Sequence, residues 1–394
     1  MNTFRHLAAL CLAMALAACG TLSREAFTER DLTSLAPQGL SALRFNASDA
    51  AAATAMAQGI GRAPGSGGQL DVLAISGGGA NGAYGAGVLA GWSARGQRPT
   101  FRLVTGVSTG ALIAPFAFLG PRWDQPLREA YTNGSASHIA RRSWSALFVL
   151  PGLYRPDALR ALVEANTSLS MLKEIAAEHR KGRRLLVATT NLDTEETVIW
   201  DMGAIALQGD AKALKLFQDV LVASASIPGA FPPTLIQVDG PGRELSEMHA
   251  DGGVTIPFFV APEALSLWTG PKDGQASTSH VYVIVNGKTG TAFGFTKGST
   301  LAIVARSFDA GTKAQVRTQL AISAALAQRN GATFAYTAIP AEVDANSLNF
   351  KVDNMRRLYE LGYERALMGL AWTAAAAPTS VTPDMPPKTS PGSP

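Results

Sequence analysis

Short apolar runs alternate along the chain with longer segments in which apolar residues recur at helical spacing. Runs of roughly four to eight apolar residues are typical of buried strands, and helical spacing over more than about ten residues is typical of amphipathic helices. The candidate strands are Leu70–Ile75, Phe101–Gly106, Leu185–Thr190, Glu196–Asp201, Val281–Val285 and Thr333–Ile339. The candidate helices are Ala47–Gly59, Ala83–Arg95, Thr109–Leu119, Pro156–Ala165, Ala211–Ala223, Ser299–Asn330 in one or two pieces, and Asn354–Leu370. This alternation predicts an α/β fold around a mainly parallel sheet.

The first residues of the chain are a targeting signal and not part of the fold. Met1–Ala18 carries Arg5 and His6 near its start and continues as the apolar run Leu7–Ala18, which is too short to span a bilayer; this is typical of a signal peptide. Small residues then precede Cys19, and this arrangement resembles the signal of bacterial lipoproteins, in which the cysteine becomes the lipidated first residue. The resemblance implies a lipid anchor in the cell envelope. Because Gly20 is not the aspartate associated with inner-membrane retention, it implies the outer membrane. The alternative is an ordinary secretory signal cleaved near Ala18.

Composition divides the mature chain into three parts. Residues 19–69 end in the flexible stretch Arg62–Gly68 and are predicted to be a lipid-anchored N-terminal extension or linker. Residues 70–372 carry the alternating pattern and are predicted to form the folded domain. Residues 373–394 are rich in proline and serine and are predicted to be a disordered tail. We expect no membrane-spanning segment after the signal.

Composition also argues against several classes of function. The chain is 47% hydrophobic and 16% charged, which is enough apolar material for a large core, and its net charge of +4 is only a weak bias toward anionic partners. The densest basic stretch, Arg180–Arg184, leads into an apolar run, so we interpret it as a solvated helix end and not as a nucleic-acid-binding arm. With Cys11 inside the signal, the mature chain keeps one cysteine and can form neither an internal disulfide nor a Cys-rich metal site. We therefore expect no nucleic acid, no metal and no cofactor; protein partners remain unknown.

A glycine-rich loop follows the first strand and precedes a helix. In this stretch, Gly77, Gly78, Gly79 and Gly82 allow a tight turn that presents several backbone N–H groups at a helix N-terminus, where anions bind. The spacing also fits a dinucleotide-binding loop. However, no Asp or Glu occurs between Val72 and Trp123 to hold a ribose, and no lysine is present for a phosphate-binding loop of the Walker type. The loop alone therefore leaves two interpretations open, an oxyanion hole and a plain tight turn.

A second motif ends the next strand. Gly106-Val107-Ser108-Thr109-Gly110 fits the pattern G-x-S-x-G, in which a sharp strand-to-helix turn exposes a nucleophilic serine. The two motifs end consecutive strands of one β-α-β unit, so both lie at the carboxyl edge of a parallel sheet. The loop amides can then face the carbonyl oxygen that Ser108 attacks.

The serine needs a base. Asp251 is followed by two glycines, which would let its carboxylate approach another loop closely, although Asp-Gly is also an ordinary turn signal. His138 and His179 lie in polar contexts and are expected to be surface residues. Ser108, Asp251 and His280 follow the order of a Ser-Asp-His triad, which remains an alternative. We favour a base other than His280 because this residue starts an ordinary β-branched strand.

Three motifs in this order resemble the patatin-like phospholipase family: Gly77–Gly82, Gly106–Gly110 and Asp251–Gly253. The stretch Ala223–Pro233 resembles the family too, and the likeness covers roughly Leu70 to Gly369. The resemblance implies a three-layer α/β/α sandwich with a mainly parallel central sheet. It also implies a Ser-Asp dyad in which Ser108 is the nucleophile and Asp251 its base, with the oxyanion hole formed by Gly77, Gly78, Gly79 and Gly82. The chain departs from the family at Asn81, where Arg or Lys is usual.

The resulting hypothesis is a serine acyl hydrolase that cleaves fatty-acyl esters of phospholipids or related lipids. Candidates for an apolar substrate cleft are Ile113, Phe116, Phe118, Ile227, Phe231, Phe258 and Phe259, although such residues more often belong to the plain core. Arg141–Leu150 combines basic, aromatic and apolar residues and is a candidate interfacial lid or else a buried helix with a charged end. The alternatives are an envelope lipoprotein with little catalytic activity and a binding or structural role, and a Ser-Asp-His hydrolase or peptidase.

Overall fold

The computed structural model describes residues 22–32, 36–37, 43–61, 70–138, 156–240, 242–260, 279–291, 293–296, 298 and 300–374. The predicted signal peptide Met1–Ala18, the predicted lipidation site Cys19 and the candidate lid Arg141–Leu150 lie outside the described residues. The helices among the described residues lack the length and apolarity that crossing a bilayer requires.

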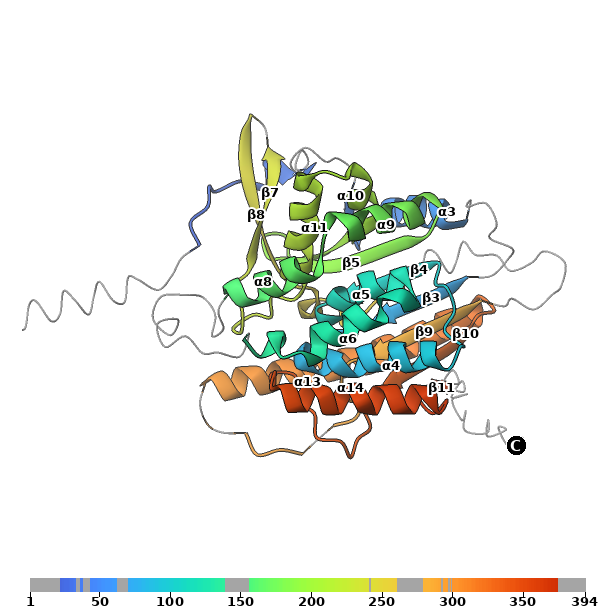
Figure 1. Cartoon of the computed structure of the whole chain (residues 1–394). Coiled ribbons are helices and arrows are strands. Elements are labelled where there is room, and N and C mark those ends of the chain that lie inside the picture. Colours follow the sequence, from blue (N-terminus) through green and yellow to red (C-terminus); the bar gives the residue numbers. More distant parts are fainter. Residues whose placement is uncertain are drawn as a thin grey trace, which may run out of the picture.

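One sheet organises the described part of the chain (Figure 1). Its centre is five parallel strands in the order β5 (Arg184–Asn191), β4 (Leu103–Val107), β3 (Asp71–Ile75), β9 (His280–Val285) and β10 (Thr333–Ala338). Every residue of β3 and β4 is buried, as expected for strands covered on both faces. Antiparallel strands extend both sides: β1 (Ala36–Pro37), β2 (Arg44–Asn46), β6 (Glu196–Asp201), β7 (Thr234–Gly240), β8 (Arg243–Asp251) and β11 (Thr373–Ala374).

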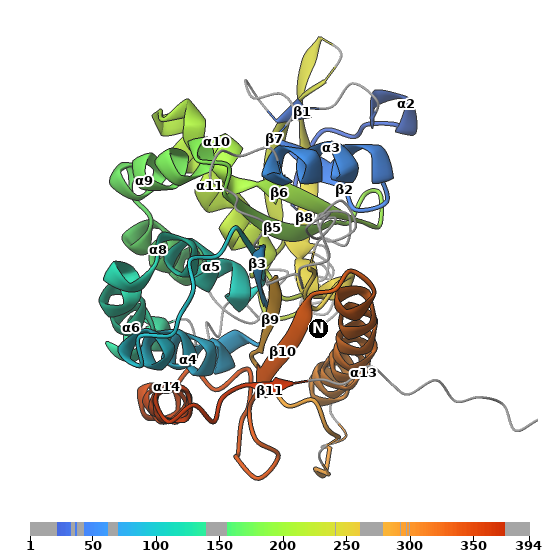
Figure 2. The same ribbon diagram turned by 90° about the vertical axis from the view of Figure 1, so that its right-hand side faces the viewer.

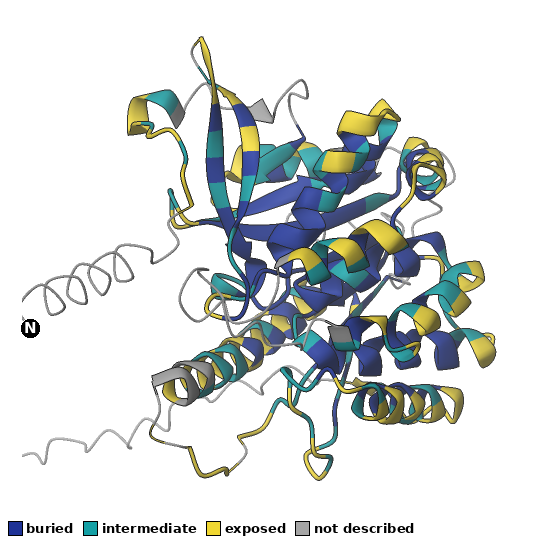
Figure 3. Cartoon of the chain, turned by 60° about the vertical axis from the view of Figure 1, so that its left-hand side comes forward, coloured by how far each residue is buried: buried dark blue, intermediate teal, exposed yellow. Residues whose placement is uncertain are grey.

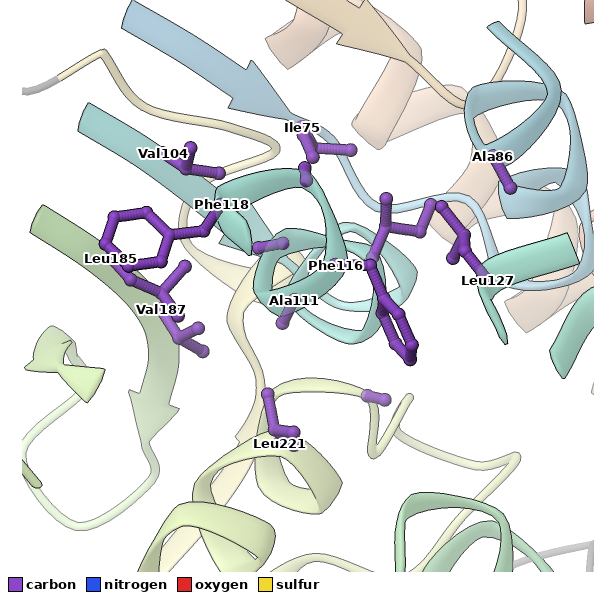
Figure 4. Packing of buried hydrophobic residues seen from close by; sticks show 14 of the residues in the cluster. Ile75, Ala86, Val104, Ala111, Phe116, Phe118, Leu127, Leu185, Val187 and Leu221 are labelled. Atoms are coloured by element: carbon purple, nitrogen blue, oxygen red, sulfur yellow. The ribbon is translucent and has the colours of Figure 1, made fainter. Parts of the chain in front are cut away.

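Helices cover both faces of the sheet, so the molecule has three layers, as Figure 2 shows. Side chains alternate across β3: Leu73 and Ile75 belong to one apolar cluster, and Val72 and Ala74 to the other. The first cluster, part of which is drawn in Figure 4, lies under α4 (Gly82–Ala94), α5 (Thr109–Leu119), α6 (Asp124–Thr132), α8 (Pro156–Asn166), α9 (Leu169–Arg180), α10 (Met202–Gln208), α11 (Ala211–Ser224) and α14 (Val352–Leu367). The second lies under α3 (Ala50–Gly61) and α13 (Thr300–Arg329). The predicted α/β/α sandwich is confirmed.

Short helical turns complete the described elements. They are α2 (Glu29–Leu32), η1 (Gly79–Asn81), η2 (Pro121–Trp123), η3 (Ser135–His138) and η4 (Gly252–Val254). The turn η1 lies in the glycine loop, separated by three residues from the end of β3, and η4 directly follows β8 in the Asp-Gly-Gly motif. Colouring by burial shows the strands as the most buried layer and the β7–β8 hairpin extending to an exposed tip (Figure 3).

Close contact between α4 and α14 fixes the helix that follows the glycine loop. A Cβ atom at Gly87 would lie 2.0 Å from the carbonyl oxygen of Tyr359, and one at Gly362 would lie 2.2 Å from that of Tyr84. Only glycine therefore lets the two backbones approach this closely. The small residues of α4 serve helix packing, and they hold the N-terminus of α4 against the site.

The segment between residues 43 and 61, assigned by sequence to an extension, contributes to the same sheet and core. Strand β2 pairs with β6, and Ala57 and Ile60 of α3 belong to the second apolar cluster. Arg44 of β2 forms an ion pair with the buried Glu247 of β8 and lies over the ring of Trp200. This part of the chain therefore contributes directly to the packing of the strand that carries Asp251.

The expectation of a solvated helix end at Arg180–Arg184 holds for the exposed Arg180 and Lys181 but is wrong for Arg183, and the expectation of a surface His179 is also wrong. Arg183 is 7% exposed, donates to the carbonyl oxygens of Phe101 (2.7 Å) and Phe118 (2.6 Å), and lies over the Phe118 ring. His179 has a mostly buried side chain 3.5 Å from Asp201. Arg183 thus fixes the turn between α9 and β5 against the sheet, because a buried guanidinium needs nearby acceptors. Nothing in the local sequence reveals these distant partners.

Candidate active site

Ser108 occupies a strained turn between β4 and α5. Its φ and ψ angles are 56° and −126°, a conformation that L-residues rarely adopt and that costs about 1–3 kcal/mol. The flanking glycines make the turn possible: a Cβ at Gly106 would lie 2.6 Å from the carbonyl oxygen of Gly110, and a Cβ at Gly110 would lie 2.2 Å from that of Ile75. The G-x-S-x-G spacing is thus required by backbone contacts on both sides of the serine.

Asp251 lies at the end of β8 and meets Ser108 across 143 residues of sequence. Ser108 Oγ donates a hydrogen bond to Asp251 Oδ2 at 2.6 Å, and the N–H of Gly253 donates to Asp251 Oδ1 at 2.7 Å. A Cβ at Gly252 would lie 2.5 Å from the carbonyl oxygen of Ala188, so only glycine allows the turn to lie this close to β5. The serine and the aspartate are 4% and 2% exposed.

Burial sets the proton affinity of Asp251. Desolvation raises the pKa of its carboxyl from 3.8 to about 7, although the hydrogen bonds from Ser108 and the Gly253 N–H act in the opposite direction. A carboxylate with a pKa near neutrality can both accept a proton from a hydroxyl and return it to a leaving group. The environment of Asp251 therefore suits a general base that works without a histidine.

The glycine loop lies directly against the serine. A Cβ at Gly77 would lie 3.1 Å from Ser108 Cβ. Its N–H donates to the carbonyl oxygen of Pro257 at 3.3 Å, and the N–H of Gly82 bonds within the helical turn, so these two amides are already used. The N–H groups of Gly78 and Gly79, whose φ angles are 157° and 55°, have no hydrogen-bond partner within the part of the chain that the structure describes. These two amides remain available to an anion next to Ser108.

Asn286, which the sequence did not single out, braces this loop. It follows β9 and is 1% exposed. Its amide nitrogen donates to the carbonyl oxygen of Ser76 at 2.8 Å, and its Oδ1 accepts from the N–H of Gly85 at 3.1 Å. A Cβ at Gly78 would lie 2.0 Å from its carbonyl oxygen. A single asparagine after a strand carries no motif, so only the fold reveals this role.

No histidine in the described residues bonds to Ser108 or Asp251. His280 lies at the start of β9, opposite Asp71 at the start of β3, and its Nδ1 lies 2.8 Å from Asp71 Oδ1. The strands β9, β3 and β4 run parallel, and Ser108 follows the end of β4. His280 at the start of β9 is therefore roughly five residues, at about 3.3 Å each, from the edge of the sheet that carries Ser108. His249 is fully buried and bonds Thr189 and Glu247. The arrangement does not bring a Ser-Asp-His triad together.

An apolar cavity opens at Ser108. The centre of a water molecule can occupy about 60 Å³ of it. The cavity is lined by Gly79, Ser108, Thr109, Leu112, Phe116, Ala130, Tyr131, Ala136, Leu159, Leu162, Val163, Asn166, Thr167, Leu221, Ala225, Ile227, Phe231, Phe350 and Met355. Of the seven lining candidates named from sequence, Phe116, Ile227 and Phe231 line it, whereas Ile113 and Phe118 belong to the core beneath and Phe258 and Phe259 to the opposite face. Most of the wall on α8 was not predicted, because an amphipathic helix does not reveal which apolar residues border a cavity.

The described residues contain no group of three or more His, Cys, Asp and Glu side chains arranged to hold a metal ion. The polar groups around Ser108 include its own hydroxyl, the Asp251 carboxylate, backbone amides and the Ser224 hydroxyl. Such a set is able to transfer a proton and to stabilise a developing oxyanion.

The chain is similar to a known protein family and to several solved structures. Residues 73–262 match the family model of the Patatin-like phospholipase family, a segment that includes the glycine loop, Ser108 and Asp251. Among solved structures, the crystal structure of VipD from Legionella pneumophila is similar at 12% sequence identity, covering 78% of this chain and 68% of VipD, with a TM-score of 0.33. No curated protein sequence matches the chain.

Proposed function

Because the chain belongs to the patatin-like phospholipase family, a family of lipid acyl hydrolases, we propose that it cleaves fatty-acyl ester bonds of phospholipids or related lipids through a Ser108–Asp251 dyad. The observation that carries the proposal is the 2.6 Å hydrogen bond from Ser108 Oγ to Asp251 Oδ2, with Ser108 in the lining of an apolar cavity. A nucleophile, a base and an apolar cleft for an acyl chain then lie together.

The reaction starts when ionised Asp251 takes the Ser108 proton as Oγ attacks the ester carbonyl carbon. The carbonyl π electrons move to oxygen, and the N–H groups of Gly78 and Gly79 donate to the resulting oxyanion. We assign these two as donors because the amides of Gly77 and Gly82 have backbone partners. The oxyanion then collapses, the bond to the alcohol breaks, and Asp251 returns its proton to the leaving alkoxide.

The acyl group is now an ester of Ser108. Asp251 accepts a proton from water as the water oxygen attacks the acyl carbon and forms a second oxyanion. Its collapse breaks the bond to Ser108 Oγ and releases the fatty acid, and Asp251 returns the proton to Ser108 Oγ. The acyl chain lies in the cavity between α5 and α8, along Leu112, Phe116 and Leu162. The apolar lining excludes water from the chain and leaves the polar head outside.

The same proposal includes the cellular location. Lipidation of Cys19 would hold the enzyme on the cell envelope, at the outer membrane, with lipid as both anchor and substrate. Two or three acyl chains on one residue give stable attachment, whereas a single chain is marginal. Labelling cells with a radioactive fatty acid, comparing the natural chain with Cys19→Ser, tests the anchor directly.

A substrate panel tests the activity. Purified protein should release fatty acid from phospholipid or lysophospholipid vesicles and from p-nitrophenyl esters, but should leave peptides of mixed sequence intact. Ser108→Ala should reduce each rate by roughly 10³-fold or more, since it removes the nucleophile. Peptide cleavage that depends on Ser108 would instead support a peptidase, and absence of ester hydrolysis with every lipid would contradict the proposed function.

A further inference from the structure

The end of α11 and the residues that follow it contact both members of the dyad, although the mechanism above assigns them no role. Ser224 Oγ accepts a hydrogen bond from the N–H of Ser108 at 3.0 Å. Two residues later, the carbonyl oxygen of Ser226 accepts one from the N–H of Asp251 at 3.0 Å. One short segment therefore holds the main chain of the nucleophile and that of the base.

The Ser224 hydroxyl links the turn at Ser108 to the sheet. It is 0% exposed, and besides accepting from Ser108 it donates to the carbonyl oxygen of Ala188 at 2.7 Å. Ala188 is the β5 partner of Val107, the residue before the nucleophile. Because a hydroxyl is a donor and an acceptor at once, one side chain satisfies two buried backbone groups where the pairing of β4 with β5 ends.

This link bears on the direction of the nucleophile. Ser108 adopts φ 56° and ψ −126°, a conformation that persists only where the surroundings enforce it. A hydrogen bond to its N–H fixes the peptide plane between Val107 and Ser108, and so the direction in which Cβ and Oγ point. Because the Ser108 N–H already donates to Ser224 Oγ, it is not free to donate to an oxyanion.

We propose that Ser224 is a positioning residue for acyl transfer, whose hydroxyl holds the Ser108 peptide so that Oγ stays within hydrogen-bond distance of Asp251. The inference rests on the proposed function. It differs from a general structural role, because it makes the rate of attack by Ser108, and not only folding, depend on one hydroxyl outside the dyad.

Ser226 offers a matched control. It lies on the same segment, is 1% exposed, and its hydroxyl donates to the carbonyl oxygen of Val222 at 2.8 Å. Its contact with Asp251 uses the backbone oxygen, which Ser226→Ala retains. Ser224→Ala and Ser226→Ala therefore remove equally buried hydroxyls, and only the first touches the nucleophile.

The test compares these variants in kcat, KM, thermal midpoint and pH profile with a soluble p-nitrophenyl ester. We expect Ser224→Ala to lower kcat roughly 10- to 100-fold at similar KM, since a displacement near 1 Å costs about that much, and Ser226→Ala to stay within about threefold of the natural protein at a comparable thermal midpoint. The acid limb of the Ser224→Ala profile should also move to higher pH, because the bond from Ser108 that lowers the pKa of Asp251 is weakened.

Equal kcat and equal acid limbs in the two variants would overturn the inference. If Ser224→Ala does not fold, Ser224→Cys keeps nearly the same shape with a weak donor and acceptor, and it should show the same lowered kcat. A Ser224→Cys protein with unchanged kcat would equally reject the role. An inactive natural protein would contradict the proposed function itself, so the two failures are distinguishable.

Discussion

Replacing Asp251 by Asn should inactivate the enzyme and yet stabilise it at alkaline pH. The carboxyl has a pKa of about 7 in the folded chain against 3.8 as its ordinary value. Each pKa unit corresponds to about 1.36 kcal/mol, so keeping this carboxylate charged in its buried site costs about 4 kcal/mol. The hydrogen bonds from Ser108 and the Gly253 N–H offset only part of the desolvation.

The sign of the pH dependence follows from proton binding. Between pH 3.8 and about 7 the folded protein holds a proton that the unfolded chain has lost, so this group's contribution to stability is full at low pH and declines as pH rises through that window. The amide introduced by Asp251→Asn cannot titrate, so the variant escapes this loss. The difference in unfolding free energy between the variant and the natural protein should therefore grow by about 4 kcal/mol from about pH 4 to about pH 8.

Urea unfolding of both proteins at about pH 4 and about pH 8, extrapolated linearly to water, measures this difference. All other titrating groups are common to the two proteins, so their effects cancel. Ser108→Ala is the control, because it leaves the carboxylate in place. A stability difference that does not change between these two pH values would refute the claim that Asp251 is buried at a substantial cost.

Three further predictions use the same geometry. The kcat/KM of the natural protein for a soluble ester should fall below an apparent pKa near 7, since protonated Asp251 cannot act as base, and a profile flat down to about pH 5 would contradict this. His280→Ala should keep hydrolysis within about threefold, because His280 bonds Asp71 at the opposite edge of the sheet; a loss comparable to Ser108→Ala would instead support the triad. Arg44→Ala should lower the unfolding free energy by about 3 kcal/mol in urea at about pH 7, since it removes the arginine partner of buried Glu247 and leaves this carboxylate only its contact with His249. Arg128→Ala, which removes an exposed pair with Glu360, should cost less than about 1 kcal/mol.

The central layers of the fold could be predicted because their signals are local. The strand predicted at Phe101–Gly106 corresponds to β4, and the helix predicted at Thr109–Leu119 has the bounds of α5. Fully buried parallel strands are continuous apolar runs, and glycines mark the turns that follow them. Such signals also indicated the residues that meet at the site, Ser108 and Asp251, although their catalytic roles remain a prediction.

What could not be predicted depends on contacts between distant segments. Strand β8 contains Glu247 and His249, whose burial rests on Arg44 and Thr189 from other parts of the chain. The cavity wall on α8 and the bond from Ser108 to Ser224 likewise follow from how the helices pack. These residue types occur in many settings, so their partners become visible only in the folded chain.

The most direct test of the central claim is to identify the residue that reacts with a fluorophosphonate. Intact mass and peptide mapping should find one adduct, on the peptide that contains Ser108, with no adduct in Ser108→Ala and labelling slowed at least roughly 10²-fold in Asp251→Asn. An adduct on another serine, or undiminished labelling of the Asp251→Asn variant at about pH 8, would contradict the assignment of the dyad.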